Sequence, residues 1–398
     1  MSTAKTIATT GARIKIAVMS DLHCQLERER LDSLLLVGSL RTPAERHPIQ
    51  SLIKLIDAER FTADVLLVPG DLANKGEREG LSQAWDYVLE VGARLSATAV
   101  IPVLGNHDIE SRRIVSSRDP TYFARNLRPG FPFGSDADCA SFFTDGFCTL
   151  NLSDNTQAVL INSVVDHIDP ESAQRGTFSV DRIQRLADSL RVSLTAPIRI
   201  AMMHHHPALH SGPFSPDLDV IPTGDALLRA LSDGGCRLVI HGHKHLARLR
   251  HVDNMVIFAA GSFSALMNEY GSAMGNMFHL LDIENPNILA TELRGTIKTW
   301  TFQLGSGWIK SNLRFRGFPF TTGFGRTAAV PNMVNALSAL VSSQSGVSIF
   351  AEADVLAAVP ELPFMMPDEF EMLVGGLSSL GLKFICYEDG RFDLGKVI

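Results

Sequence analysis

The stretch Ala99-Val100-Ile101-Pro102-Val103-Leu104-Gly105-Asn106-His107-Asp108 carries the pattern that decides the fold: an apolar run followed at once by a polar cluster. Similar apolar runs occur at residues 14–19, 65–68, 158–161, 199–203, 238–240 and 255–258. Several are continuously apolar, which is typical of strands buried on both faces. Amphipathic segments such as 48–56 and 80–95 lie between them, each with one apolar helical face. The alternation predicts an α/β core in which helices cover the sheets.

The composition is that of a globular protein. The chain has 398 residues, 45% hydrophobic and 20% charged, which excludes collagen-like and wholly disordered proteins. No apolar run approaches the roughly 18 residues of a membrane helix, and residues 1–13 lack the apolar core of a secretory signal. The five cysteines are odd in number and form no CxxC pair, so we expect reduced thiols and a cytoplasmic protein.

The charge balance argues against nucleic acid as a partner. The formal net charge is −7 at pH 7, so a broad electrostatic grip on a polyanion is not expected. From residue 330 onward, nine acidic residues stand against three basic ones, which disfavours duplex binding by this part of the chain. We therefore do not expect nucleic acid to be a partner, and we expect packing or a protein contact as the role of the acidic tail.

The chain divides into three predicted parts: a flexible N-terminus at residues 1–12, a main domain at 13–329 and a small C-terminal domain at 330–398. The last part predicts helices at 332–342, 352–359 and 367–380 and a hairpin of residues 383–387 and 391–397, a winged-helix-like shape. The Phe-rich stretch at 315–320 can pack this tail onto the core or onto a second copy of the chain. The second case would make the protein a homo-oligomer through its C-terminal region.

Five polar clusters each follow a run that we expect to form a strand. They are Asp21-Leu22-His23, Gly70-Asp71-Leu72, Gly105-Asn106-His107-Asp108, His204-His205-His206-Pro207 and Gly242-His243-Lys244-His245. In α/β sheets, loops from separate strands converge on a ligand at the carboxyl ends of the strands. The sequence therefore predicts one composite site built from five distant segments.

The side chains in these clusters offer carboxylate and amide oxygens and imidazole nitrogens, without a thiolate. Such donors suit Mn, Fe or Zn better than Cu(I) or an iron–sulfur cluster. The histidines within 204–206 and 241–245 would repel one another if all were protonated, whereas a bound cation holds neutral imidazoles. Because the donors are too many for one ion, we expect two divalent or trivalent metal ions that share a carboxylate, about 3.5–4 Å apart.

In this order the five clusters resemble the calcineurin-like metallophosphoesterase family, whose pattern is D-x-H, G-D, G-N-H-D/E, a His two places before Pro, and G-H-x-H. The resemblance covers roughly residues 13–265; each block alone is weak, but five in order are specific. It implies that residues 13–329 form a catalytic domain, a two-sheet β-sandwich flanked by helices (αββα). The C-terminal part would be a small α+β appendage.

The resemblance also implies a set of metal ligands. One metal ion would be held by Asp21, His23 and His245, the other by Asn106, His243 and one histidine of 204–206, with Asp71 bridging the two. The position two places before Pro207 selects His205 as the remaining ligand. His204 and His206 stay open as alternatives, because strand registers shift easily by one residue.

The same resemblance gives His107 and Asp108 catalytic roles. Two metal ions lower the pKa of a shared water, so that hydroxide is present near neutral pH and attacks phosphorus. A protonated His107 then stabilises the developing charge or protonates the departing oxygen. Asp108 would orient His107 through its ring N–H, or would simply cap the segment that follows it.

The arrangement is similar to the bacterial cyclic-nucleotide and glycerophosphodiester phosphodiesterase branch of the family. It implies a phosphoric diester hydrolase for a small nucleotide-type substrate such as a cyclic nucleotide. Two alternatives stay open: a phosphomonoesterase or nuclease of the same family, and a non-catalytic metal-binding scaffold. The acidic tail and the lack of heptads argue against a nuclease, and the complete ligand set argues against a scaffold.

Further residues near the clusters carry weaker predictions. A charged loop is usually a solvated surface, yet arginine side chains bind phosphate well. The candidate contacts to a substrate phosphate are Arg112, Arg113, Arg118, Arg125 and Arg128. His210 lies on a loop that we expect to border the site. Asn74 should shape its loop and His241 should be structural. Strand alternation should turn Lys244 away from the metals, into a solvent or structural role.

Overall fold

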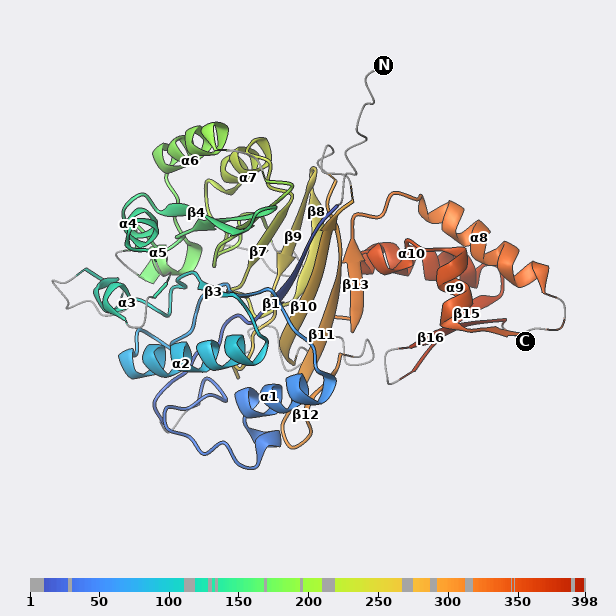
Figure 1. Cartoon of the computed structure of the whole chain (residues 1–398), viewed down its shortest axis with the longest axis horizontal. Helices are drawn as coiled ribbons and strands as arrows, with labels where there is room; N and C mark the ends of the chain where they lie inside the picture. The colour runs from blue at the N-terminus through green and yellow to red at the C-terminus, as the bar shows by residue number, and fades with distance from the viewer. Residues whose placement is uncertain are drawn as a thin grey trace, which may run out of the picture.

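The computed structural model describes residues 11–27, 31–110, 119–127, 131–132, 135–167, 170–193, 196–209, 219–266, 275–286, 292–311, 318–344, 346, 348–387 and 391–396. The first ten residues, nearly all of the segment predicted to be flexible, lie outside this description. Two large sheets pack face to face, and helices cover both outer sides (Figure 1). The predicted two-sheet α/β architecture is confirmed.

The first sheet has seven strands and is centred on β1 (Ala12–Val18). Its order is β12 (Gly307–Lys310), β11 (Arg294–Gln303), β10 (Asn276–Asn285), β1, β2 (Val65–Val68) and β3 (Ala99–Pro102), with β13 (Thr321–Phe324) also paired to β11. The strands β1, β2 and β3 run parallel, and β10 runs antiparallel to β1. The carboxyl ends of β1, β2 and β3 therefore lie at one edge.

The second sheet has six strands. Its order is β4 (Phe147–Ser153), β5 (Thr156–Ile161), β6 (Ile198–Met202), β7 (Leu238–His241), β9 (Met255–Ala259) and β8 (Arg248–Val252). The four inner strands run parallel, whereas β4 and β8 pair antiparallel at the two edges. The inner strands are buried on both faces, which explains their continuously apolar sequences.

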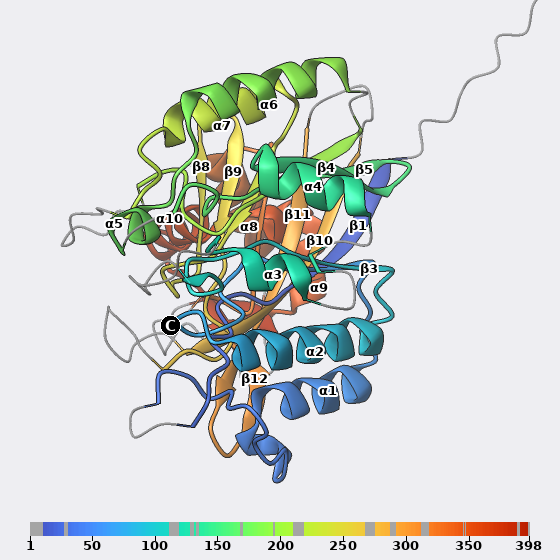
Figure 2. The ribbon, with the colours of Figure 1, turned by 90° about the vertical axis from the view of Figure 1, so that its left-hand side faces the viewer.

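Alternate residues of one strand join different cores, which defines the layers. In β5, Ala158 and Leu160 belong to the large apolar cluster shared with the first sheet, whereas Val159 and Ile161 belong to a second cluster. The second cluster also holds apolar residues of α6 (Val180–Val192) and α7 (Gly224–Asp233). On the opposite side of the molecule, α1 (Pro48–Glu59) and α2 (Arg78–Arg94) lie side by side over the first sheet (Figure 2).

Shorter helices occupy the connections: η1 (Ala44–Arg46), α3 (Tyr122–Asn126), α4 (Asp136–Thr144) and α5 (Pro170–Arg175). Serine side chains cap two helices, because Ser135 accepts from the amide of Asp138 at α4 and Ser179 accepts from that of Arg182 at α6. Within the described ranges, no helix combines the length and the apolar character that crossing a bilayer requires.

The C-terminal part has its own apolar core, separate from the two clusters of the sandwich. Its elements are α8 (Val330–Ser343), β14 (Ile349–Phe350), α9 (Glu352–Ala358), η4 (Leu362–Phe364), α10 (Pro367–Ser378), β15 (Leu382–Cys386) and β16 (Phe392–Lys396). The three predicted helices and the hairpin are confirmed, although its turn at 388–390 lies outside the described residues. The predicted boundary between residues 329 and 330 stays a prediction; α8 begins at that point.

Polar contacts tie the C-terminal part to the edge strand β13. The amide of Gly323 and the hydroxyl of Thr322 both donate to the carbonyl of Met365, at 2.8 and 3.0 Å. Arg326 forms a half-buried ion pair with Glu369. From the Phe-rich stretch, Phe320 packs edge-on against Trp300 of the sandwich, at 5.4 Å between ring centroids. This part of the stretch packs on the core; residues 315–317 lie outside the described residues.

Candidate metal centre

The two sheets bring the five polar clusters to one place. Three clusters follow β1, β2 and β3 of the first sheet, and the other two follow β6 and β7 of the second. The sheets are joined there by hydrogen bonds, such as that from the amide of Phe263 to the carbonyl of Ser20, 2.7 Å long, and that from the amide of His243 to Oδ1 of Asp21, 3.0 Å long. Segments more than 200 residues apart therefore share one site.

The backbone is left-handed at five of the predicted ligands. Their φ angles are positive: Asp21 (54°), His23 (48°), Asp71 (54°), His243 (83°) and His245 (57°). Residues with a side chain rarely adopt this conformation, which costs on the order of 1–3 kcal/mol each and is found mainly where function requires it. Such a concentration of strained residues in one loop cluster points to a functional site.

Two motif glycines allow the loops to approach the carboxylates. A Cβ atom at Gly105 would lie 2.1 Å from Oδ1 of Asp71, and one at Gly242 would lie 2.6 Å from Oδ2 of Asp21. Both distances are far inside van der Waals contact, so any side chain would push the loop off the carboxylate. This explains why glycine precedes Asn106 and His243 in their motifs.

The first group of donors surrounds Asp21. Oδ1 of Asp21 lies 3.5 Å from Nε2 of His245 and 3.9 Å from Nε2 of His23. The two imidazoles face each other, with 2.9 Å between their Nε2 atoms, and Nε2 of His23 lies 3.5 Å from Oδ2 of Asp71. The structure thus brings together the three residues predicted for one metal and the predicted bridging aspartate.

The second group surrounds His204. Its Nε2 lies 3.3 Å from Oδ2 of Asp71 and 3.2 Å from Oδ1 of Asn106, while its Nδ1 lies 2.8 Å from the carbonyl oxygen of Pro69. The ring centroid of His243 is 5.1 Å from that of His204. The predicted residues Asp71, Asn106 and His243 therefore gather around His204.

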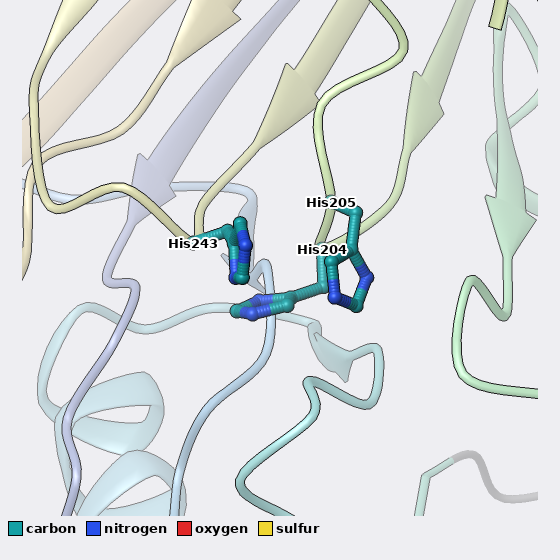
Figure 3. A group of neighbouring side chains, drawn as sticks. All are labelled: His204, His205 and His243. Atoms are coloured by element: carbon teal, nitrogen blue, oxygen red, sulfur yellow. The ribbon is translucent and has the colours of Figure 1, made fainter. Parts of the chain in front are cut away.

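His205, the histidine selected from the sequence, lies beside this group and has partners of its own. Its Nδ1 is 2.8 Å from the hydroxyl of Ser163 and its Nε2 is 3.0 Å from the carbonyl oxygen of Ala173. It remains near the centre, since its nitrogens and those of His204 and His243 lie within 4.8 Å of one another (Figure 3). His206 packs edge-on against His241, at 5.1 Å, and against His243, at 5.4 Å.

Burial sets the protonation of these histidines. It lowers the pKa of His243 to about 3 and holds the pKa values of His23 and His205 well below the ordinary value. Burial alone would also lower the pKa of His204, but the neighbouring Asp71 carboxylate raises it to about 9. The centre therefore offers neutral imidazoles, with one positive charge beside Asp71.

The two central aspartates stay ionised although they are buried. Burial alone would raise the pKa of Asp21, but the hydrogen bond and charge of His245 outweigh it and lower the pKa to about 2. Burial opposes ionisation of Asp71 as well, and the charges of His204 and His107 hold its pKa well below its usual range. The two ionised carboxylates favour the binding of cations.

Asn74, and not Asp108, lies on the ring of His107. Oδ1 of Asn74 is 3.1 Å from Nδ1 of His107, and its amide nitrogen donates to Oε1 of Gln25 at 2.7 Å. The two oxygens of Asp108 accept from the backbone amides of Ala73 and Gly105, at 2.8 and 2.9 Å. Burial and the charge of Asp71 raise the pKa of Asp108 to about 7. Asp108 therefore holds loops together, and Asn74, predicted only to shape its loop, contacts the ring of His107.

Lys244 is buried, in an ion pair with Asp219. Only 8% of the Lys244 side chain and 9% of the Asp219 side chain are exposed, so of its two predicted roles the structural one fits. His241 is buried as expected, with Nδ1 3.1 Å from the carbonyl oxygen of Gly242. Arg125 pairs with Asp119 at 3.3 Å. The remaining candidate substrate contacts, Arg112, Arg113, Arg118, Arg128 and His210, lie outside the described residues.

The donors present fit a metal centre. Nδ1 of His23 is buried and finds no hydrogen-bond partner in the described part of the chain. Ligand atoms lie within 4.8 Å of one another in overlapping groups: His204, His205 and His243; Asp21, His23 and His245; His23, Asp71 and His107; and Asp21, Asp71 and His204. Oxygen and imidazole donors without a thiolate suit divalent metal ions such as Mn, Fe and Zn.

Solved structures similar to this chain have low sequence identity to it. Purple acid phosphatase PPD1 from yellow lupin (Lupinus luteus) seeds is 11% identical, with a TM-score of 0.48, over 78% of this chain and 56% of that chain. GAP50 of Plasmodium is 12% identical, with a TM-score of 0.39, over 75% and 89%. Zinc-bound Vps29 of Entamoeba histolytica is 12% identical, with a TM-score of 0.33, over 74% and 95%. This chain thus spans little more than half the length of the lupin phosphatase.

Sequence comparison gives the family. No curated protein sequence matches this chain. The sequence profile of the calcineurin-like phosphoesterases matches residues 14–247, which is more than half of the chain and contains all five polar clusters. The chain therefore belongs to the calcineurin-like phosphoesterase family.

Proposed function

We propose that this chain hydrolyses a small phosphodiester at a centre of two metal ions. The observation that carries the proposal is the position of Asp71 between two groups of donors. Oδ2 of Asp71 lies 3.5 Å from Nε2 of His23 on one side and 3.3 Å from Nε2 of His204 on the other. A carboxylate in this position can serve two cations at once.

The proposed ligands of one ion are Asp21, His23, Asp71 and His245, and those of the other are Asp71, Asn106, His204 and His243. His204 takes the place predicted for His205, because its Nε2 faces both Asp71 and Asn106, whereas both nitrogens of His205 face other groups. His205 and Ser163 would then support the ring of His243, whose centroid is 4.4 Å from that of His205.

When bound, two divalent or trivalent cations supply the charge that activates a water molecule and neutralises the phosphoryl oxygens. The chain supplies positions and protons. The buried carboxylates of Asp21 and Asp71 would offset the positive charge of the ions, and imidazoles in the neutral form would serve as ligands. The amide of His107 donates to Oδ1 of Asp71 at 2.8 Å, which fixes that oxygen and keeps His107 next to the centre.

His107 is the proposed proton donor to the leaving group. Its ring lies 4.6 Å from that of His23, and its Nδ1 contacts Oδ1 of Asn74 and the amide of Lys75, so Nε2 is the atom that we propose to act on the departing oxygen. Both His107 and Asn74 are buried, which limits the positions that the ring can take. A positioned acid of this kind contributes roughly 10²–10⁴-fold to the rate.

The proposed substrate class follows from the resemblance of the motifs, which favours a small nucleotide-type diester such as a cyclic nucleotide. The proposed location of the protein is the cytoplasm. The net charge of −7 disfavours long polyanions, so a nuclease is the weaker alternative. A phosphomonoesterase would use the same centre. A scaffold that binds metal without catalysis would keep the ligands and lack turnover.

The test is to load the purified chain with Mn, Fe or Zn and to compare hydrolysis of bis-p-nitrophenyl phosphate, cyclic AMP, p-nitrophenyl phosphate and single-stranded DNA. We expect turnover of the two diesters to exceed that of the monoester and of DNA. Preference for the monoester would assign a phosphatase, and no turnover with any metal would reject the enzymatic proposal. Asp71→Ala is the inactive control.

A further inference from the structure

A cavity of about 240 Å³ lies between the sandwich and the C-terminal part of the chain. Residues from Pro319 to Thr322 line it on the side of the sandwich, and α9, η4, α10 and the start of β16 line it on the other side. Figure 1 shows these two parts meeting beside β13. None of the proposed metal ligands lines this cavity, so it is separate from the metal centre.

Aromatic rings form much of the wall. Phe320 comes from the sandwich, whereas Phe370, Phe392 and Tyr387 come from the C-terminal part. These rings are only partly covered, and 43% of Tyr387 is exposed. Apolar surface left open to water costs roughly 25 cal/mol per Å², so a ligand that covers the rings gains that free energy. Rings of this kind also attract cations, as the ammonium of Lys310 does 5.0 Å from the centroid of Phe320.

Two carboxylates of this wall remain without a counter-charge. Glu352 and Glu371 line the cavity, and in the described part of the chain neither side chain has a hydrogen bond or an ion pair. Two other glutamates of the same junction are used differently. Glu369 pairs with Arg326, and Glu361 accepts from the hydroxyl of Thr327 at 2.6 Å. Glu361 and Glu369 therefore bind groups of the junction itself, whereas Glu352 and Glu371 line the cavity.

The lining also contains one base, Arg391, whose guanidinium lies over the ring of Tyr387, 5.7 Å from its centroid. Among the residues that line the cavity, two acids therefore stand against one base. Pockets bind small molecules by combining apolar walls with a few placed polar groups. Here the walls fit an aromatic or alkyl body and the polar groups fit a positive charge.

We infer that this cavity is a binding site for a small amphipathic cation, with an aromatic or alkyl body among the rings and an amine at Glu352 and Glu371. Because the walls come from both parts of the chain, the bound cation joins the sandwich to the C-terminal part. The site is independent of the proposed hydrolysis, so either proposal can fail without the other.

The test uses three probes of matched shape: 3-phenylpropylamine, 3-phenylpropanol and 3-phenylpropionate. Binding to the full chain is measured by titration calorimetry, and the thermal midpoint is followed with each probe. We expect the amine to bind at least tenfold more tightly than the alcohol and to raise the thermal midpoint of unfolding. The carboxylate should bind most weakly of the three. Equal affinities for the three probes, or no binding of any, would overturn the inference.

Variants locate the site. The double change Glu352→Gln with Glu371→Gln should remove the preference for the amine over the alcohol, and Leu356→Trp should fill the cavity and abolish binding of both. Asp368→Asn, an exposed change on α10 outside the cavity lining, is the matched control and should leave all three affinities unchanged. The circular dichroism spectrum should be the same in every variant, which shows that each remains folded. An amine preference that survives the double change would contradict the assignment.

Discussion

Nε2 of His204 lies 3.3 Å from Oδ2 of Asp71, although the two residues follow strands of different sheets. His204 comes after β6 of the second sheet and Asp71 after β2 of the first. Residues 204–206 are three successive histidines, and this contact between the two sheets distinguishes His204 from His205 and His206. It is the geometric basis for assigning the ligand of the second metal ion to His204.

Replacement of single histidines tests this assignment. His204→Ala removes a ligand of the second ion, so we expect its affinity to fall by at least 100-fold. His205→Ala removes only a support of the ring of His243, and we expect a loss nearer the 10-fold end of the range for such outer contacts. Metal titration with detection by mass spectrometry measures both. The reverse order of the two losses would restore His205 as the ligand.

Asn74 offers a test of the proton donor. Without the amide of Asn74, the ring of His107 is held less well, and we expect Asn74→Ala to lower kcat about 10- to 100-fold on a dialkyl phosphate. The loss should be smaller on bis-p-nitrophenyl phosphate, because p-nitrophenolate leaves without needing a proton. A matched change at Asn254, which bonds the side chain of Ser232, should leave both rates unchanged. Equal losses on the two esters would contradict a role of Asn74 through His107.

The buried ion pair of Lys244 and Asp219 should matter for stability. Lys244→Met leaves the carboxylate of Asp219 buried without its partner, a change that typically costs about 3–5 kcal/mol. The double change Lys244→Met with Asp219→Asn should be less destabilising than the single one, since it removes the unpaired charge. Denaturation by urea measures the free energy of unfolding of each variant. A single change as mild as the double one would show that the pair is effectively solvated.

His279 predicts a loss of stability in acid. Burial lowers its pKa to about 3, well below the 6.5 of an exposed imidazole, so between these values the unfolded chain binds more protons than the folded chain. The contribution of neutral His279 is complete above pH 6.5 and is lost as the pH falls, at up to about 1.4 kcal/mol per pH unit. His279→Gln should flatten this dependence of the unfolding free energy on pH. The matched control is His251→Gln, an exposed histidine, which should leave the slope unchanged.

The apolar strands predicted the α/β core, and the order of the polar clusters implied the two sheets through the resemblance to the family. The sequence could not choose among three adjacent histidines, since spacing to Pro207 says nothing about which ring meets a carboxylate of the other sheet. Nor could it show that the two oxygens of Asp108 accept from the backbone amides of Ala73 and Gly105.

Lys244 shows the limit of pattern arguments in a strained loop. Strand alternation was expected to turn it away from the metals, but the flanking residues His243 and His245 have φ angles of 83° and 57°, so no strand exists there. Its partner Asp219 is 25 positions away in the sequence, on another loop. A contact of this kind is set by the packing of two loops and leaves no signal in the local sequence.

The most direct test of the account is anomalous scattering from crystals of the chain grown with Mn or Zn. The account predicts two peaks with Asp71 between them, one beside Asp21, His23 and His245 and one beside Asn106, His204 and His243. Asp71→Ala should reduce the occupancy of both peaks. A single peak away from Asp71, or no peak in a chain replenished with metal, would contradict the central claim.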